Sequence, residues 1–200
     1  MLSLKERIEL LERDLQAYPP TFTISADLPF AILRYDPTHA QETEWHMRRE
    51  MKHLATRIQN ATGKVVHLIS LADLYWQSIN ESEGLDEIID LEHDRGFLVA
   101  EAQVGDYLSD PDWRAITDLL VEITQHMHPA SELLFLYRAA VFAPSSYRVS
   151  TLLERLMGRV RVPAVLFYPG TWSTSLNYMG MRSDEEPLGS YRVKIYGREQ

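Results

Sequence analysis

Cysteine is absent from this chain of 200 residues, which excludes a thiol nucleophile, a thiolate metal site and disulfide bonds. Such a composition suits a reducing compartment, so we expect a cytoplasmic protein. Long apolar runs are also missing, and none approaches the roughly 18 residues of a membrane-spanning helix. The first 15 residues have a charged, amphipathic pattern and do not read as a signal peptide. We therefore expect no membrane contact.

The motifs of nucleotide-binding proteins are missing too. A Walker loop places Gly-Lys-Ser/Thr between a strand and a helix, whereas Gly63-Lys64 follows a helical pattern and begins an apolar run. In that order the backbone amides would not surround a phosphate at a helix N-terminus. Gly-x-Gly-x-x-Gly does not occur. We therefore expect no cofactor.

Positive charge is scarce: 20 Lys and Arg stand against 29 Asp and Glu, a net charge of −9. Because affinity for nucleic acid comes mainly from neutralising phosphates, we expect no direct tight DNA binding. Many of the acids fall in one stretch, namely Glu81, Glu83, Asp86, Glu87, Asp90, Glu92 and Asp94. This stretch is either a solvated helix face or a surface that binds a basic partner.

Two strand–helix–strand patterns indicate the fold. The first joins apolar runs at 30–35 and 64–71 through a helical pattern at 40–60. The second contains a strand at 133–142, a helix at 146–157 and a strand at 162–168. Both have the spacing of βαβ units with parallel strands. We predict a three-layer α/β domain with a mainly parallel central sheet and helices on both faces.

The length favours a single domain over residues 1–200. Residues 1–18 form an N-terminal helix, in which Ser3 and Glu6 have capping-box spacing. This helix either packs on the core of its own domain or docks on a partner. The polar segment 72–128 is a helical insertion or a set of covering helices, with Ile123 among its inward residues, and alternation at 190–196 predicts a half-buried final strand.

Groups suited to catalysis do not form a complete set. His46, Glu50 and His53 share one side of the helix at 40–60, a spacing that zinc ligands can use. No ligand from a second helix is evident, so a solvated flank is the better interpretation. Ser145 and Ser146 stand between a strand and a helix, but Gly-x-Ser-x-Gly is missing, so they read as a helix cap. We predict no catalytic residue and no metal site.

The last third of the chain contains three linked motifs. They are AVFAPSSYRVSTLLERL at 140–156, RVPAVLFYPG at 161–170 and YRVKIY at 191–196. In this order, and in a chain of this length, the sequence resembles the BrxB family of bacterial phage-exclusion (BREX) loci. The segment 171–180 departs from the family pattern.

The resemblance implies a small component of a multi-protein defence system. Its other parts include a methyltransferase, a large ATPase and PglZ, a phosphatase-like protein. The family offers no catalytic residues to carry over. The resemblance therefore implies a non-catalytic adaptor that binds PglZ or another BREX component.

Two alternatives from other functional classes stay open. One is a degenerate nucleotide-binding, NTPase-like domain that uses its strand-end loops without a Walker lysine. The other is a metal-dependent hydrolase or nuclease that uses Asp36, His39, Asp73 and Arg148.

A partner surface is expected where parallel strands end, because all such strands end at the same edge of the sheet. The turns concerned are 36–39, 70–73, 144–148 and 169–172. This edge offers Tyr147, Arg148, Tyr168 and Trp172. Aromatic residues and Arg are enriched at binding hot spots, so we expect these four residues to bind the partner. The acidic helix near 86–94 and the N-terminal helix are the next candidates.

Overall fold

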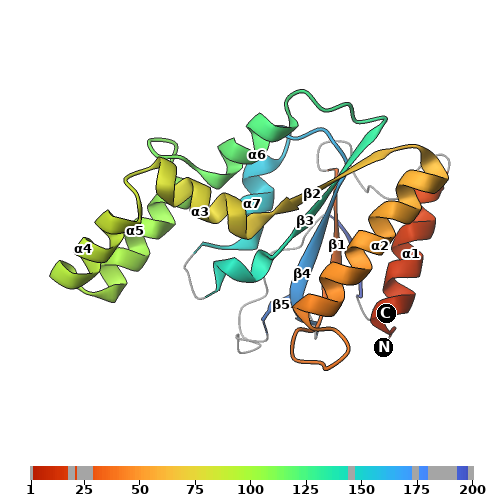
Figure 1. Ribbon diagram of the computed structural model, residues 1–200, viewed down its shortest axis with the longest axis horizontal. Helices are drawn as coiled ribbons and strands as arrows, with labels where there is room; N and C mark the ends of the chain where they lie inside the picture. The colour runs from red at the N-terminus through yellow and green to blue at the C-terminus, as the bar shows by residue number, and fades with distance from the viewer. Residues whose placement is uncertain are drawn as a thin grey trace.

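A six-stranded β-sheet with helices on both faces organises the chain (Figure 1). The computed structural model describes residues 2–17, 21, 29–143, 147–172, 176–179 and 193–197. The strands are β1 (Phe30–Tyr35), β2 (Val65–Ser70), β3 (Glu132–Tyr137), β4 (Ala164–Trp172), β5 (Leu176–Tyr178) and β6 (Lys194–Tyr196). The helices are α1 (Leu4–Gln16), α2 (Glu44–Thr62), α3 (Leu71–Glu81), α4 (Leu85–Arg95), α5 (Phe97–Ser109), α6 (Ile116–Thr124), α7 (Val149–Leu156) and the 3-10 helix η1 (Ala139–Phe142). The predicted three-layer α/β architecture is confirmed.

The strands are arranged in the order β2-β3-β4-β1-β6, and these five are parallel; β5 pairs with β4 in the antiparallel sense. The second predicted βαβ unit is confirmed, because α7 joins the neighbouring strands β3 and β4. The first predicted unit is right about the direction of its two strands but wrong in making them neighbours. Strands β1 and β2 are parallel, but β3 and β4 lie between them, so α2 crosses over two strands before the chain re-enters the sheet.

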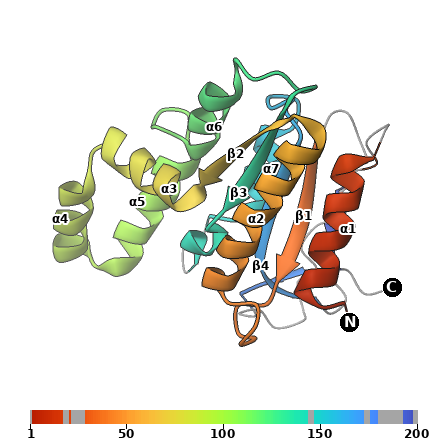
Figure 2. The ribbon, with the colours of Figure 1, turned by 45° about the vertical axis from the view of Figure 1, so that its right-hand side comes forward.

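Helices α1 and α2 cover one face of the sheet, and α3, α5, α6 and α7 cover the other (Figure 2). Side chains of β1 alternate between the two cores: Ala31 and Leu33 face α1 and α2, whereas Phe30 and Ile32 face the opposite helices. This two-sided burial explains why the strand reads as a continuous apolar run. The chain therefore leaves β1 across one face and leaves β2 and β3 across the other.

Local signals set the two helices on the first face. Ser3 and Glu6 form the predicted capping box at the start of α1, with Ser3 N–H donating to Glu6 Oε2 at 2.8 Å. Helix α2 buries a stripe made of Met47, Met51, Leu54 and Ile58. It ends at Gly63, whose φ of 71° belongs to the left-handed region that glycine adopts without strain.

Four details differ from the sequence prediction. Strand β3 ends at Tyr137, and the apolar residues after it form η1, where Ala139 and Phe142 are buried without continuing the strand. Ile123 of α6 is exposed. Tyr196 is buried, so the final strand is covered on both faces where only one was expected. Strand β4 continues to Trp172, so residues 169–172, expected as a turn, belong to the strand. The expected helix cap, Ser145 and Ser146, lies outside the described residues and stays a prediction.

Two buried arginines tie the layers together at one end of β1. The guanidinium of Arg7 on α1 pairs with the carboxylate of Glu42 and donates to the carbonyl of Arg34 at 2.6 Å. Glu42 in turn accepts the backbone N–H of Asp36 at 2.8 Å. The side chain of Arg34 donates to the carbonyls of Gly170 and Gly197, each at 3.2 Å. Helix α1, the β1–α2 turn and the ends of β4 and β6 are thereby held to β1.

A second polar cluster joins α1 to β6. Asp14 accepts from Lys194 Nζ at 2.5 Å and from the Tyr196 hydroxyl at 2.7 Å. Burial raises the pKa of Asp14, but the hydrogen bonds from Lys194 and Tyr196 lower it by more, so its pKa lies below the ordinary value. The charged form of Asp14 therefore stabilises the fold.

Arg7→Ala should destabilise the protein strongly, because it leaves the Glu42 carboxylate without its cation in a buried site. Such a loss costs about 3–5 kcal/mol, and each kcal/mol lowers Tm by roughly 2–4 °C in a chain of this size. Thermal unfolding measures the effect. Arg13→Ala on the exposed side of the same helix is the control and should leave Tm almost unchanged. The double variant Arg7→Met with Glu42→Gln removes both charges of the pair, so its Tm should be higher than that of Arg7→Ala. Equal Tm values for Arg7→Ala and Arg13→Ala would contradict the structural role of Arg7.

Asp14→Asn should destabilise the protein at pH 7 and should do so by less at pH 3. Because the pKa of Asp14 is lower in the folded protein than in the unfolded chain, its contribution is present above the unfolded-state pKa of about 4. The contribution is lost as the pH falls through the folded-state pKa. Thermal unfolding of both proteins at the two pH values measures the difference. A Tm difference that does not shrink on acidification would contradict this assignment.

Candidate functional site

The carboxyl ends of β1, β2, β3 and β4 meet at one edge of the sheet, as their parallel arrangement requires. Arg138 after β3 donates to Asp73 Oδ1 at 3.0 Å and to Ser70 Oγ at 3.4 Å, which joins the ends of β3 and β2. Tyr178 of β5 donates to the carbonyl of Ala139 at 2.6 Å. In doubly covered parallel sheets, ligands bind at this edge, where the connections change face. This edge is therefore the candidate functional site.

The FYPG motif needs glycine at position 170, because the chain turns back on itself at this edge. A Cβ atom at Gly170 would lie 2.3 Å from the carbonyl oxygen of Asn177, because β5 runs directly against the end of β4. Tyr168 packs edge-on against Tyr178, with ring centroids 5.7 Å apart. The motif thus closes the β4–β5 ribbon, and its tyrosine and glycine have structural roles there.

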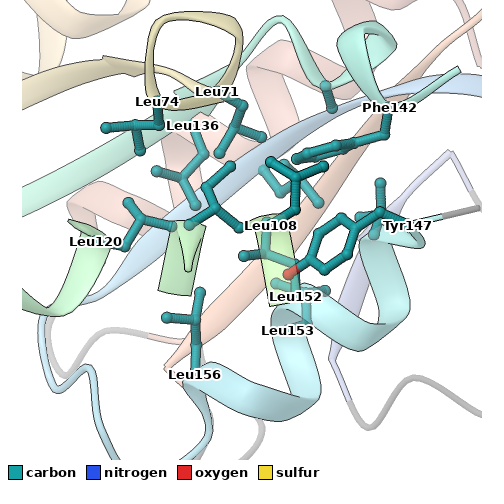
Figure 3. Close-up of a cluster of buried hydrophobic side chains, with 14 of the residues drawn as sticks. Leu71, Leu74, Leu108, Leu120, Leu136, Phe142, Tyr147, Leu152, Leu153 and Leu156 are labelled. Atoms are coloured by element: carbon teal, nitrogen blue, oxygen red, sulfur yellow. The ribbon is translucent and has the colours of Figure 1, made fainter. Parts of the chain in front are cut away.

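The four residues expected to bind a partner differ in exposure. Tyr168 is 1% exposed and Tyr147 is 6% exposed, whereas Arg148 is exposed and Trp172 is half-buried against the core. Figure 3 shows the ring of Tyr147 among Leu108, Leu152 and Leu153 of the core. Only Arg148 and Trp172 offer surface to another molecule.

The hydroxyl of Tyr147 has no hydrogen-bond partner in the part of the chain that the structure describes. Burial raises the pKa of this tyrosine, and Arg155 lowers it by less.

Arg148, the neighbour of Tyr147 in the chain, borders a hollow of about 480 Å³ between α5 and α7, together with Asp106, Ser109 and Arg155. The side chain of Arg155 donates to the carbonyl of Ser109 and so joins the two helices across this hollow.

A larger, half-open cleft of about 640 Å³ lies beside the end of β1. Its walls are the first turns of α1 and α2 and the turn between β1 and α2. The polar side chains that line it include Asp36, His39, Glu42, His46, Arg49 and Glu50. Position and size make this cleft the natural candidate for a small ligand.

The β1–α2 turn is not built to hold a phosphate. The Glu42 carboxylate accepts the N–H of Asp36 and pairs with Arg7, so an anion of the protein itself already occupies the end of β1. Thr43 caps α2 by accepting the N–H of His46 at 3.4 Å. A phosphate-binding turn needs free backbone amides and no competing carboxylate. Glu42 would repel the phosphate that such a turn is meant to bind.

The residues of the hydrolase hypothesis are divided among three places. Asp36 and His39 line the cleft at β1, Asp73 pairs with Arg138 at β2, and Arg148 borders the hollow beside α7. Strands β1 and β2 are three strand spacings apart, which is about 14 Å. Residues so far apart cannot share one metal ion. Within the described ranges, no three His, Asp or Glu side chains lie close enough together to hold a metal, and this covers His46, Glu50 and His53.

Four residues important at this edge were not singled out from the sequence. Arg34 had a signal, since a charged residue inside the apolar strand FAILRY demands a buried partner. Arg7 and Glu42 had none, because their pairing depends on the position of α1. Arg138 is in the left-handed conformation with φ of 59°, which is uncommon for a residue other than glycine.

Comparison with known proteins gives one match. The family model described as BREX protein BrxB matches residues 67–194, which is more than half of the chain. No curated protein and no solved structure matches. The matched part runs from within β2 to the first residue of β6 and includes the carboxyl ends of β2, β3 and β4, while α1, β1 and α2 precede it. Among the helices that the structure describes, none is long and apolar enough to cross a membrane.

The purified protein should hydrolyse neither ATP nor DNA above background, with or without Mg²⁺ or Mn²⁺, because the candidate residues do not converge. Nucleotides should also leave Tm unchanged, since a ligand that binds only the folded state would raise it. Turnover assays and thermal-shift measurements check both statements. Activity that disappears in Asp36→Ala or Arg148→Ala would establish the hydrolase alternative. A nucleotide-dependent rise in Tm would establish the nucleotide-binding alternative.

Proposed function

The chain belongs to the BrxB family and is a component of a BREX phage-defence system, and we propose that it acts there as a non-catalytic adaptor. Its expected partner is PglZ or another BREX component. The absence of cysteine from the sequence fits a cytoplasmic location for this assembly.

The observation that carries the proposal is the use of charged groups at the carboxyl edge. Glu42 pairs with Arg7, Asp73 pairs with Arg138, and Glu44 accepts from the hydroxyl of Tyr35. Each of these groups stabilises the turn in which it lies. A catalytic site would instead hold acids and bases that point together toward a substrate. The edge therefore supports recognition better than chemistry.

Within this edge, we propose Arg148 and Trp172 as the residues that contact the partner. Arg148 is exposed beside the hollow between α5 and α7, and Trp172, the last residue of β4, is half-buried. Tyr147 and Tyr168 are buried, and their rings pack on Phe142 and Tyr178. Because Tyr147 directly precedes Arg148 and Tyr168 lies in the same strand as Trp172, we include both in the proposed site as buried supports. Trp and Arg are the residue types that contribute most at protein interfaces.

Arg148→Glu should weaken co-purification of the tagged protein with BREX proteins encoded at the same locus. The change inverts a charge on an exposed side chain, so Tm should stay within a few degrees. Arg161→Glu is the matched control, since Arg161 is also exposed but precedes β4 at the opposite edge of the sheet. Normal binding by Arg148→Glu would exclude this surface. Failure of the unaltered protein to bind any BREX protein would overturn the adaptor proposal itself.

A further inference from the structure

The whole net charge of the protein is concentrated in one projecting hairpin. Residues 83–112 contain ten Asp and Glu and one Arg, a net charge of −9, which equals the net charge of the entire chain. The other 170 residues hold nineteen acids and nineteen bases and are neutral as a whole. This segment consists of α4 and α5, and we call it the acidic arm.

The acidic arm extends away from the sheet, at the end of the molecule opposite α1 and α2 (Figures 1 and 2). Helix α4 packs chiefly on α5, and Ile88 is its only buried residue. Helix α5 returns to the body, where Val104, Tyr107 and Leu108 enter the core. The outer half of the arm therefore orders two helical segments while burying little apolar surface, which places it among the least stable parts of a fold.

The tip of the arm is apolar. Gly96 turns the chain with φ of 88°, and the first three residues of α5 follow directly. Phe97 is 57% exposed, Leu98 is 76% exposed and Val99 is 41% exposed. Successive helical residues point in directions about 100° apart, so three consecutive apolar side chains cannot all face the body. Two more apolar side chains, Leu85 and Ile89, are exposed one turn apart on α4.

Single exposed apolar residues are ordinary, but three together at the end of a charged projection are not. Interfaces combine an apolar centre with a charged rim that complements the partner. On the arm, Phe97 and Leu98 supply the centre, and acids on α4 such as Asp90 and Asp94 supply the rim.

We propose that the acidic arm docks on a second protein through a basic surface that surrounds an apolar pocket, with Phe97 and Leu98 inserted in the pocket. This proposal rests on the proposed adaptor function, since an adaptor needs a second surface besides the one at Arg148. The negative charge of the arm favours a basic protein as its partner. Nucleic acid and anionic membranes repel such an arm, and a second copy of the chain would bring two equal charges of −9 together.

Two arm variants test the proposal in the full-length protein. Phe97→Ser with Leu98→Ser removes the apolar tip, and Asp86→Asn, Glu87→Gln and Asp90→Asn together reduce the charge. Each BREX protein of the locus is co-expressed separately with the tagged chain, and the dissociation constant of every pair that forms is measured. Both variants should weaken binding to one component by about tenfold or more, as expected for a hot spot. The charge variant should also reduce the dependence of that binding on salt.

Matched controls separate the arm from general surface effects. Trp45→Ser removes an apolar side chain that is 63% exposed on α2, on the far side of the molecule. Glu9→Gln, Glu12→Gln and Glu154→Gln remove three acids outside the arm. These controls should bind normally, and all variants should keep Tm within a few degrees. Hydrogen exchange of the complex should show new protection of α4 and the tip of α5.

The outcomes distinguish the two proposals. Unaltered binding by both arm variants, or new protection confined to α1 and α2, would overturn the arm proposal and leave the adaptor function in place. A change in oligomeric state of the arm variants by light scattering would identify a second copy as the occupant and also overturn it. If the unaltered chain binds no BREX protein, the adaptor function fails first.

Discussion

The buried ion pair between Arg7 and Glu42 is the constraint on which the rest of the edge depends. A guanidinium that is fully removed from water is tolerated only when its donors are satisfied. The donors of Arg7 reach Glu42, the carbonyl of Arg34 and, at 3.3 Å, the carbonyl of Ser3. Helix α1 must therefore seat on β1 in one register. Its apolar stripe lies in the core, so this helix stabilises the domain and leaves little apolar surface for a partner.

The same constraint determines what the carboxyl edge can do. Because Arg7 needs an acceptor, the carboxylate of Glu42 occupies the end of β1, where a nucleotide phosphate would otherwise lie. Because Arg34 needs acceptors, the backbone of Gly170 and Gly197 is drawn to the same place. The position at the end of β1 that a bound phosphate would need is therefore filled by groups that stabilise the fold. Strand β1 also pairs with β4 and β6 in the middle of the sheet, so the part matched by the family model relies on the preceding segment to complete its fold.

Signals confined to neighbouring residues predicted the structure well. Strand β1 was predicted at its observed bounds, because a doubly covered strand is apolar throughout and ends at Asp36-Pro37. The capping box of α1 was correct for the same reason. Signals that depend on distant contacts failed. Strand order was not visible, since a helix of the length of α2 can return the chain to a neighbouring strand or to one further away. Similarly, the apolar run after Tyr137 continues because η1 is also buried, and the pattern does not mark where the strand ends.

The distribution of charge separates stability from recognition in this molecule. Repulsion among like charges destabilises a compact state, and the body avoids it by balancing nineteen acids with nineteen bases. The excess of acidic residues lies in the acidic arm, so the repulsion among them acts on a part of the fold that makes few core contacts. Helix α4 buries only Ile88. A separate charged projection also extends a field toward an oppositely charged protein and accelerates their encounter. The body can thus hold its buried arginines rigidly while the arm keeps the apolar tip and the charge that a partner would recognise.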